Sequence, residues 1–485
     1  MICSPRWTNT PPKSGNGFAN SSARFLEAGP SPDATLAFEQ GLTALTRELG
    51  RTTVEATYNA LEPPEPEQAP HHVRDESNLY RRLNAATPNP QVATLFGKIR
   101  LVRRGYRDVN RACPEPTIFP LEIALGLVEG ATPALACEAA RAMAETGATQ
   151  QTVLARMRRQ HGVEWGVKKL RNLTEKVSAA MTPLRREHQA QRVVEWLRQA
   201  QAQRGSGRPV LGIGRDGITL RTRPHRFYEV AATGTLTVYG RDGRRLGSVY
   251  LAYVPELGQQ TMTGELTALI EEILRQWEGP TPRLAYVTDA GDAETSYFRR
   301  VLRPMRHPRT HERLDWQWIV DYYHASERLH VMGEALFGAG REAFAWARRM
   351  GKLLKKPNGP FRVLHAAAAL KSRRSLTKRA RRDFQRAYNY LRDRSRHMQY
   401  ARFKKLRLPI GSGVTEAACK TVFSERLKLS GMIWSKPGAQ TVLNLRVVLL
   451  SGLWDTVYQA QLVQRTLPIV QTPGVSPPAT PRKPR

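Results

Sequence analysis

The fold is decided by residues 210–221, VLGIGRDGITLR, in which apolar residues recur at strand spacing over the length of one long strand. Two more segments rich in Val, Leu, Tyr and Thr follow at 226–239 and 245–254, and the sequence GRDG at 240–243 between them is typical of a hairpin turn. We therefore predict three consecutive antiparallel strands. Leu and Ile at helical spacing over 263–277 then predict a helix with one apolar face.

Strands and helices alternate after this point. The segments 283–289 (RLAYVTD) and 316–321 (WQWIVD) predict short strands, with a helix near 293–302 between them and a helix from His324 after them. Three antiparallel strands, a helix and then alternating strands and helices form the element order of a ribonuclease H-like mixed sheet, an α/β fold. Mixed sheets of this kind place catalytic groups at the ends of strands.

Three acidic residues stand at positions that such a sheet would bring together. Asp216 lies in the first strand, Asp289 ends the later strand, and Glu416 opens a helix after the Gly-rich loop PIGSG at 409–413. Three converging carboxylates repel one another unless divalent cations lie between them, and hard oxygen ligands suit Mg²⁺ or Mn²⁺. Two such ions would hold the attacking and leaving oxygens of a phosphoryl displacement.

Each acid also has a structural interpretation. Asp216 with Gly217 could form a turn, Asp289 could cap a helix, and Glu416 could be a first-turn acid favoured by the helix dipole. Asp321 and His324, in the sequence DYYHASER, could join the site or position a phosphate, and a capping role for Asp321 is an equal alternative.

The charge of the chain favours a nucleic-acid partner. Its 485 residues carry a formal net charge of +33, with a pI of about 10.7. Residues 341–410 hold 22 Lys and Arg against three acidic residues, which leaves too few opposite charges for ion pairs along a helix. We expect a helical, phosphate-contacting surface there, although a solvated charged face and a generally Arg-rich composition are alternatives. The arginines expected to contact DNA are Arg373, Arg374, Arg379, Arg381 and Arg382.

The pattern along the chain predicts seven regions. They are an unstructured arm (1–35), a helix and Pro-rich linker (36–91), a β-ribbon and helical DNA-binding region (92–205), the catalytic core (206–340), the basic helical insertion (341–408), the C-terminal helices of the core (409–460) and a flexible tail (461–485). Within the third region, the helices at 150–161 and from 164 match a helix-turn-helix outline, with Lys168 and Lys169 on the second helix. A plain helical bundle explains the same residues equally well.

Other classes of protein are excluded by simple patterns. Four cysteines lie far apart and form no Cys-x-x-Cys pair, which argues against a disulfide framework or a zinc ribbon. The chain shows no apolar signal segment and no run of about 18 apolar residues, so we expect neither a secreted nor a membrane protein.

Three stretches resemble bacterial insertion-sequence transposases of the ISKra-type group. They are 321–329 (DYYHASERL), 409–420 (PIGSGVTEAACK) and 426–435 (RLKLSGMIWS), followed by GAQ at 438–440 and an apolar helix at 446–454. The resemblance covers about residues 209–456 and is fainter over 92–180. Transposases of this group are DDE enzymes with a ribonuclease H-like core.

The resemblance implies that Asp216, Asp289 and Glu416 form the catalytic and metal-binding triad, with Mg²⁺ or Mn²⁺ as cofactor. It also implies a helical insertion before the Glu416 helix, which is where the basic segment falls. We expect a DNA transposase of the cytoplasm, associated with the nucleoid, whose partners are the terminal repeats of the element and target DNA. Synapsis of two ends would favour a homo-oligomer on DNA.

Two alternatives to an active transposase stay open: a non-catalytic DNA-binding protein derived from a transposase, and a structure-selective nuclease. The role of the helix that carries Glu416 is also open. On the helix that carries Glu416, we expect Lys420 to face the DNA or to pair with Glu416. Further along the chain, we expect Arg426 and Lys428 to follow the DNA backbone and Trp434 to pack on a sugar or a flipped base.

Overall fold

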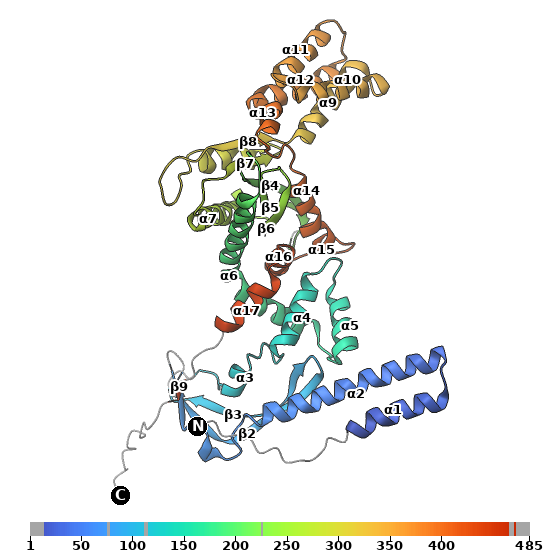
Figure 1. Cartoon of the computed structure of the whole chain (residues 1–485), viewed down its shortest axis with the longest axis vertical. Coiled ribbons are helices and arrows are strands. Elements are labelled where there is room, and N and C mark those ends of the chain that lie inside the picture. The colour runs from blue at the N-terminus through green and yellow to red at the C-terminus, as the bar shows by residue number, and fades with distance from the viewer. Residues whose placement is uncertain (1–13, 75–77, 111–114, 225–226, 465–469, 472–485) are drawn as a thin grey trace. The chain divides into compact units, whose positions relative to one another are not determined.

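We describe a computed structural model that covers residues 14–74, 78–110, 115–224, 227–464 and 470–471 (Figure 1). The chain divides into two compact units. The first contains residues up to 143, residues 149–177 and residues from 459, and the second contains residues 144–148 and 178–458. No helix in the described ranges is long and apolar enough to cross a membrane.

Two helices begin the first unit. Helix α1 (Ser14–Ala28) pairs with α2 (Pro32–Asn59), and the rings of Phe25 and Phe38 stack with their centroids 4.8 Å apart. The prediction of an unstructured arm over 1–35 is therefore wrong for residues 14–28, because α1 forms against the longer helix. Residues 1–13 lie outside the described part of the chain. The expected helix over 36–60 is present as α2, which Ser31 caps.

A small sheet follows, in the order β3-β2-β1-β9. Its strands are β1 (His72–Arg74), β2 (Leu79–Thr94), β3 (Gly97–Asp108) and β9 (Val470–Gln471), and the short helix η1 (Pro66–Gln68) precedes them. The predicted ribbon is present with Ile99 and Leu101 buried, but Leu95 lies in the turn.

The sheet corrects two predicted regions. The first part of β2 lies where a Pro-rich linker was predicted. Pro90 lies in the register shift between Asn89 and Val92, whereas Pro88 stays paired with Val102. Strand β9 belongs to the predicted flexible tail, whose other residues from 465 lie outside the described part of the chain.

Four helices complete the N-terminal half: α3 (Pro120–Ala124), α4 (Pro133–Ala144), α5 (Gln150–His161) and α6 (Val167–Ala202). Thr149 and Thr152 form a capping box at the start of α5, and Gly162 ends it with φ 64°. Both ends of α5 agree with the prediction. The next helix begins at Val167, three residues later than expected, and runs far beyond a recognition helix in length.

The second unit contains a five-stranded mixed sheet in the order β6-β5-β4-β7-β8. Its strands are β4 (Val210–Arg221), β5 (Tyr228–Tyr239), β6 (Arg245–Tyr253), β7 (Arg283–Thr288) and β8 (Trp316–Val320). Strands β4 to β6 are antiparallel, whereas β7 pairs parallel to β4 and β8 parallel to β7. The predicted α/β class is confirmed, and the pairing of β4 with β7 brings together the strands that carry the first two predicted acids.

Helices cover this sheet. The short η2 (Leu257–Gln259) leads into α7 (Gln260–Gln276), which buries the predicted Leu and Ile face. After β7 come α8 (Asp292–Tyr297) and the π-helical turn η3 (Phe298–Leu302). Near the C-terminus, α16 (Lys436–Leu450) packs beside β6 and is followed by α17 (Trp454–Gln464).

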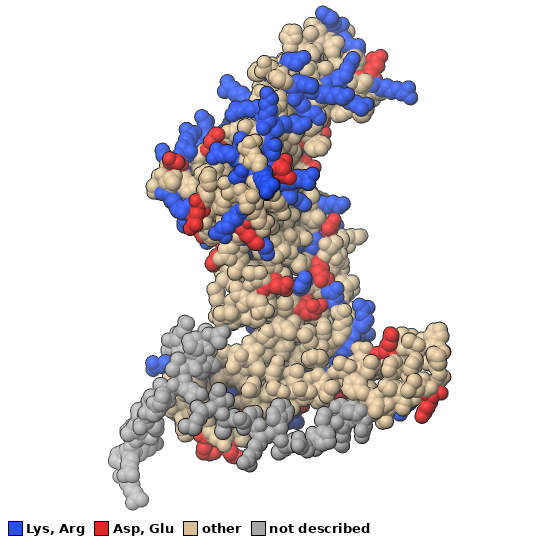
Figure 2. Space-filling model, viewed as in Figure 1, with Lys and Arg blue, Asp and Glu red and all other residues tan. Residues whose placement is uncertain are grey.

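The basic insertion is helical, as predicted. Helix α9 (Tyr322–Phe337) packs with α10 (Arg341–Leu354), α11 (Gly359–Ser372) and α12 (Lys378–Arg394), and η4 (Ser395–His397) and α13 (Tyr400–Lys405) return the chain to the sheet (Figure 1). Trp346, Phe384 and Leu391 form its buried core. Lys and Arg side chains crowd the surface of these helices (Figure 2).

Candidate active site

Two of the three predicted acids lie on adjacent parallel strands. Gly214 of β4 stands opposite Val287 of β7, so Asp216, two residues further along β4, lies beside Asp289 at the end of β7. Burial raises the pKa of Asp216, and the negative charge of Asp289 raises it further. Neither carboxylate has a Lys, Arg or His within ion-pair distance among the described residues.

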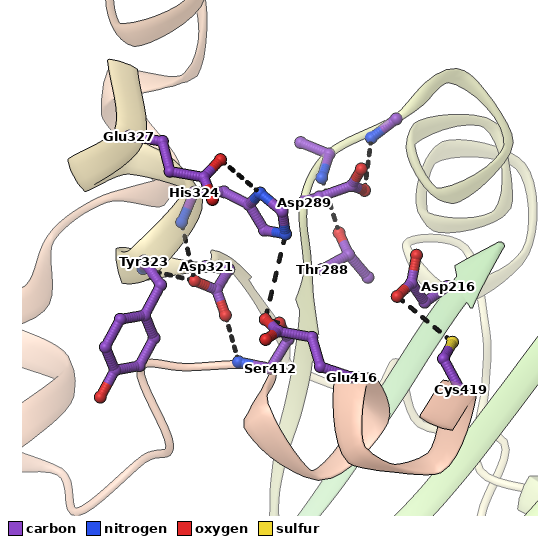
Figure 3. Close-up of polar contacts among 12 residues, drawn as sticks. Asp216, Thr288, Asp289, Asp321, Tyr323, His324, Glu327, Ser412, Glu416 and Cys419 are labelled. Carbon is purple, nitrogen blue, oxygen red and sulfur yellow. Dashed lines mark hydrogen bonds and ion pairs between the residues drawn. The ribbon is translucent and has the colours of Figure 1, made fainter. Parts of the chain in front are cut away.

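Asp216 has two hydrogen-bond donors. The Gly217 backbone N–H donates to Oδ1 at 2.7 Å. The Cys419 thiol donates to Oδ2 at 3.4 Å (Figure 3). Burial beside Asp216 raises the pKa of Cys419 to about 12, so this side chain remains a neutral thiol at neutral pH. The predicted turn at Asp216 and Gly217 is excluded, because both residues lie inside the ladder of β4 with β5.

Glu416 is brought to the same region by α14 (Gly413–Ala418), which packs against β4 and β5. Thr415 Oγ1 lies 2.8 Å from Thr235 Oγ1 on β5, which fixes the helix on the sheet. The Glu416 side chain remains 46% exposed, accepts a hydrogen bond from Ser412 Oγ at 2.6 Å, and lies 3.9 Å from His324 Nε2.

Close contact of α14 with the sheet depends on Gly214. A Cβ atom at this position would lie 1.8 Å from Thr415 Oγ1 and 2.8 Å from Thr235 Oγ1. We expect Gly214→Ala to displace α14 and to move Glu416, at a stability cost of about 1–3 kcal/mol. If the chain is the DNA transposase that the sequence leads us to expect, the same change should lower DNA cleavage by roughly tenfold or more. Gly413→Ala is the matched control, because a Cβ there meets no atom within 4 Å. Equal cleavage rates in the two variants would contradict this view of α14.

Asp321 has the capping role that the sequence offered as one of two alternatives. It is fully buried, caps α9 by accepting from the Tyr323 and His324 backbone N–H groups, and also accepts from the Ser412 N–H (Figure 3). The Tyr322 N–H donates to Ile410 O at 2.9 Å. Asp321 therefore ties the start of α9 to the loop before Glu416. His324, on the first turn of α9, lies between Glu327 Oε2 (3.3 Å from Nδ1) and Glu416.

The basic insertion also holds the Asp289 loop. The Tyr390 hydroxyl donates to Asp289 O at 2.6 Å, and Arg394 donates to Ala290 O at 3.1 Å. Ala290 has φ 60°, and the Gly291 N–H donates to Asp289 Oδ1 at 2.9 Å. The sequence carries no local signal for these contacts, because Tyr390 and Arg394 lie about a hundred residues beyond the loop that they support.

Glu294 is a fourth acid that the sequence did not single out. It lies on α8 with 7% of its surface exposed, and burial, followed by the charges of Asp289 and Asp216, raises its pKa to about 7, against an opposing effect of Arg215. Glu294 is thus protonated in the folded chain under mildly acidic conditions and ionised above neutrality.

This pKa predicts a dependence of stability on pH. Between pH 4.5 and about 7 the folded chain binds a proton on Glu294 that the unfolded chain has released, so the free energy of unfolding falls as pH rises through this window. The fall amounts to about 3 kcal/mol. In urea unfolding without divalent cations, Glu294→Gln should remove this component and be the more stable protein at pH 8. The same pH slope in both proteins would contradict it.

The donor atoms of the site fit a hard divalent cation. Asp216, Asp289 and Glu416 offer carboxylate oxygens, and the negative charge of Asp289 raises the pKa of both Asp216 and Glu294, although His324 lowers that of Asp216 and Arg215 lowers that of Glu294. As they stand, no three His, Cys, Asp or Glu side chains of the described chain are close enough to hold one ion. The exposed Glu416 carboxylate would have to move toward the two aspartates.

The residues expected to contact DNA differ in their exposure to solvent and in their contacts within the protein. In the insertion, Arg373, Arg379, Arg381 and Arg382 are exposed, as are Lys168 on α6 and Lys420 and Lys428 beyond Glu416. Arg374 is exposed but donates to Leu336 O at 2.8 Å and covers the Phe337 ring. Lys169 is half-buried above the Trp165 ring, and burial lowers its pKa.

The segment after Glu416 differs from the prediction. A π-helical turn, η5 (Cys419–Ser424), follows α14 and leads into α15 (Glu425–Leu427). The pairing of Lys420 with Glu416 is not found in the described structure.

Arg426 cannot follow a DNA backbone as predicted, because it is fully buried beneath the Trp434 ring, 5.2 Å from its centroid. Burial lowers its pKa to about 10. Trp434 donates from Nε1 to Leu427 O at 2.9 Å and forms a bridge with Thr222. One face of the half-buried indole lies over Arg426, and stacking of a sugar or base on this ring stays a prediction.

A comparison of the chain with models of protein families found no match, and a comparison with curated proteins found none either.

Proposed function

We propose that this chain is a DNA transposase with a ribonuclease H-like core, which cleaves phosphodiesters at the ends of an insertion sequence and joins them to target DNA. One observation carries the proposal: Asp216 and Asp289 lie side by side on parallel strands, and α14 packs Glu416 onto the same sheet. The strand order β6-β5-β4-β7-β8, antiparallel on one side and parallel on the other, supports it.

Asp216, Asp289 and Glu416 would hold Mg²⁺ or Mn²⁺. When bound, two such ions lower the pKa of a nucleophilic water and neutralise the charge that develops on the phosphate. The chain itself orients the ligands. Ser412 and His324 hold the Glu416 carboxylate near the site, whereas Gly217 and Cys419 fix the two oxygens of Asp216.

The proposed binding of DNA is mainly electrostatic. The exposed arginines of the insertion would contact DNA phosphates, which position the duplex without reading its sequence. Tyr390 and Arg394 join this surface to the Asp289 loop, so DNA bound on α12 would be held next to the carboxylates. In a second displacement, the freed 3′-hydroxyl would attack target DNA. Two ends joined together require two active sites, which favours a homo-oligomer on DNA in the nucleoid of the cytoplasm.

A metal-dependent strand-transfer assay on the inverted repeats that flank the gene tests this function. We expect cleavage at the element ends followed by joining to a target duplex, in Mg²⁺ or Mn²⁺ and not in a chelator. Binding without cleavage would point to a DNA-binding protein derived from a transposase. Cleavage without joining, on branched DNA of any sequence, would point to a structure-selective nuclease.

A further inference from the structure

Arg328 lies on the same face of α9 as His324, one turn later along the helix. Residues four apart in a helix are neighbours on its surface. His324 lies beside Glu416, with Nε2 3.9 Å from the Glu416 carboxylate (Figure 3). The Arg328 side chain therefore starts from the face of α9 that is turned toward the candidate active site.

The Arg328 guanidinium contacts the ring of Tyr390, a residue of α12 that also reaches the Asp289 loop. Its Cζ atom lies 5.0 Å from the ring centroid, and the hydroxyl of the same tyrosine donates to Asp289 O at 2.6 Å. Arg394 contacts this ring as well, with Cζ 4.4 Å from the centroid. One aromatic ring thus separates Arg328 from the loop that carries the second predicted acid.

The two arginines at this ring differ in what their nitrogens bind. Arg394 donates to Ala290 O at 3.1 Å and thereby supports the loop. Arg328 forms no hydrogen bond or ion pair with any residue that the structure describes. Its Nε atom is buried without a partner, whereas the side chain as a whole is partly exposed. Arg328 therefore has donors to offer to an anion from outside the chain.

Charges of both signs meet at the Tyr390 ring. Burial raises the pKa of Tyr390 to about 12. The positive charges of Arg394 and Arg328 lower this pKa, and the negative charges of Asp289 and Asp321 raise it. The ring therefore lies at the border between the acids of the site and the basic helices of the insertion. A phosphate that approaches the acids at this border needs a cation beside it.

We propose that Arg328 binds a DNA phosphate next to the one that is cleaved, and so positions the scissile bond at the Asp289 end of the site. A guanidinium can hold two phosphate oxygens at once, and its weak hydration suits a partly buried position. The inference rests on the proposed function for the chemistry at the acids. It adds a phosphate contact between those acids and the arginines of α11 and α12.

Arg328→Gln tests the contact through the salt dependence of DNA binding. It removes the charge and keeps a long polar side chain that can still cover Tyr390. We expect the slope of the logarithm of the binding constant against log salt to fall in magnitude by about 0.9, the share of one phosphate. The measurement is fluorescence anisotropy of a labelled terminal-repeat duplex in Ca²⁺, a hard cation that binds carboxylate oxygens.

Lys371→Gln is the matched control, because it removes the same charge from a side chain that is already engaged. Lys371 lies over the Phe384 ring and donates to Gln385 Oε1 at 2.8 Å. This variant should keep the salt slope and the cleavage rate of the parent protein. Arg328→Lys keeps the charge and should therefore keep the slope, which a purely structural role of Arg328 does not predict.

Cleavage tests where the bound phosphate lies. In Mg²⁺ and at saturating DNA, Arg328→Gln should cleave roughly tenfold or more slowly, because the scissile bond is displaced from the acids. An unchanged slope in Arg328→Gln, an equal fall of the slope in Arg328→Lys, or cleavage by Arg328→Gln at the parent rate overturns the proposal.

Failure of this proposal can be told apart from failure of the proposed function. A slope that falls as expected, in a chain that neither cleaves nor joins element ends, would refute the transposase and leave Arg328 as a phosphate contact. Strand transfer by the parent protein together with an unchanged slope in Arg328→Gln would refute the contact and leave the transposase.

Discussion

Asp216→Asn, Asp289→Asn and Glu416→Gln should each reduce metal-dependent cleavage roughly a thousandfold or more while DNA binding stays within about twofold. Each substitution removes one carboxylate charge that the proposed ions require and keeps the shape of the side chain. Binding should persist because, in the proposed function, the arginines of the insertion and not the acids would contact phosphates. The measurements are cleavage of end-labelled terminal repeats in Mg²⁺ and a gel-shift titration in chelator.

The free energy of unfolding of these variants distinguishes a residue that acts in catalysis from one that only stabilises the fold. Burial and the nearby charge of Asp289 raise the pKa of Asp216, so ionised Asp216 costs the folded chain free energy and Asp216→Asn should unfold no earlier than the parent protein. Asp292→Asn is the matched control, since this acid is exposed on α8 three residues after Asp289. It should cut at the normal rate. Normal cleavage in any of the three triad variants would refute the assignment of that residue.

The sheet of the second unit could be predicted almost residue by residue. Alternation over 210–221 and the turn at 240–243 reproduce β4 to β6, because both signals are local and their side chains are buried on a sheet. The same local reasoning failed at residues 14–28 and 79–91. There the helix α1 and the first part of β2 depend on pairing with α2 and β3, which no local pattern reveals.

The acids of the candidate site could be predicted from the sequence, but the residues that hold them in place could not. A strand acid, a second strand acid and a helix acid can be ordered along the sequence, but the contacts from Tyr390, Arg394 and Asp321 join segments about ninety residues or more apart. The remaining wrong prediction concerns a basic residue that is buried in the structure. Arg426 looks like any basic residue in the sequence, yet it lies in the core beneath Trp434.

Neutralising the arginine cluster of α11 and α12 should weaken DNA binding strongly and flatten its salt dependence. The variant has five residues changed to Gln: Arg373, Arg374, Arg379, Arg381 and Arg382. It lacks four exposed guanidiniums that would contact phosphate, because the fifth, that of Arg374, is already bonded within the protein. Arg374 already donates to Leu336 O and should count for little. Each lost contact lowers the slope of log K, the logarithm of the binding constant, against log salt by about 0.9, so the slope should fall in magnitude by about 3.6. The affinity for DNA near 0.1 M salt should fall on the order of a thousandfold.

Asp383, which follows these five arginines and lies on α12, provides a control of opposite sign. Asp383 lies 3.9 Å from Arg379 Nε and 3.6 Å from Arg382 Nε, so it holds part of the positive surface in local ion pairs. Asp383→Asn should release both arginines, tighten binding severalfold and steepen the salt slope. Fluorescence anisotropy of a labelled duplex between low and moderate salt measures both variants. An unchanged slope in the five-arginine variant would show that the charges of Figure 2 only face solvent, and the phosphate-binding surface would then have to lie elsewhere on the chain.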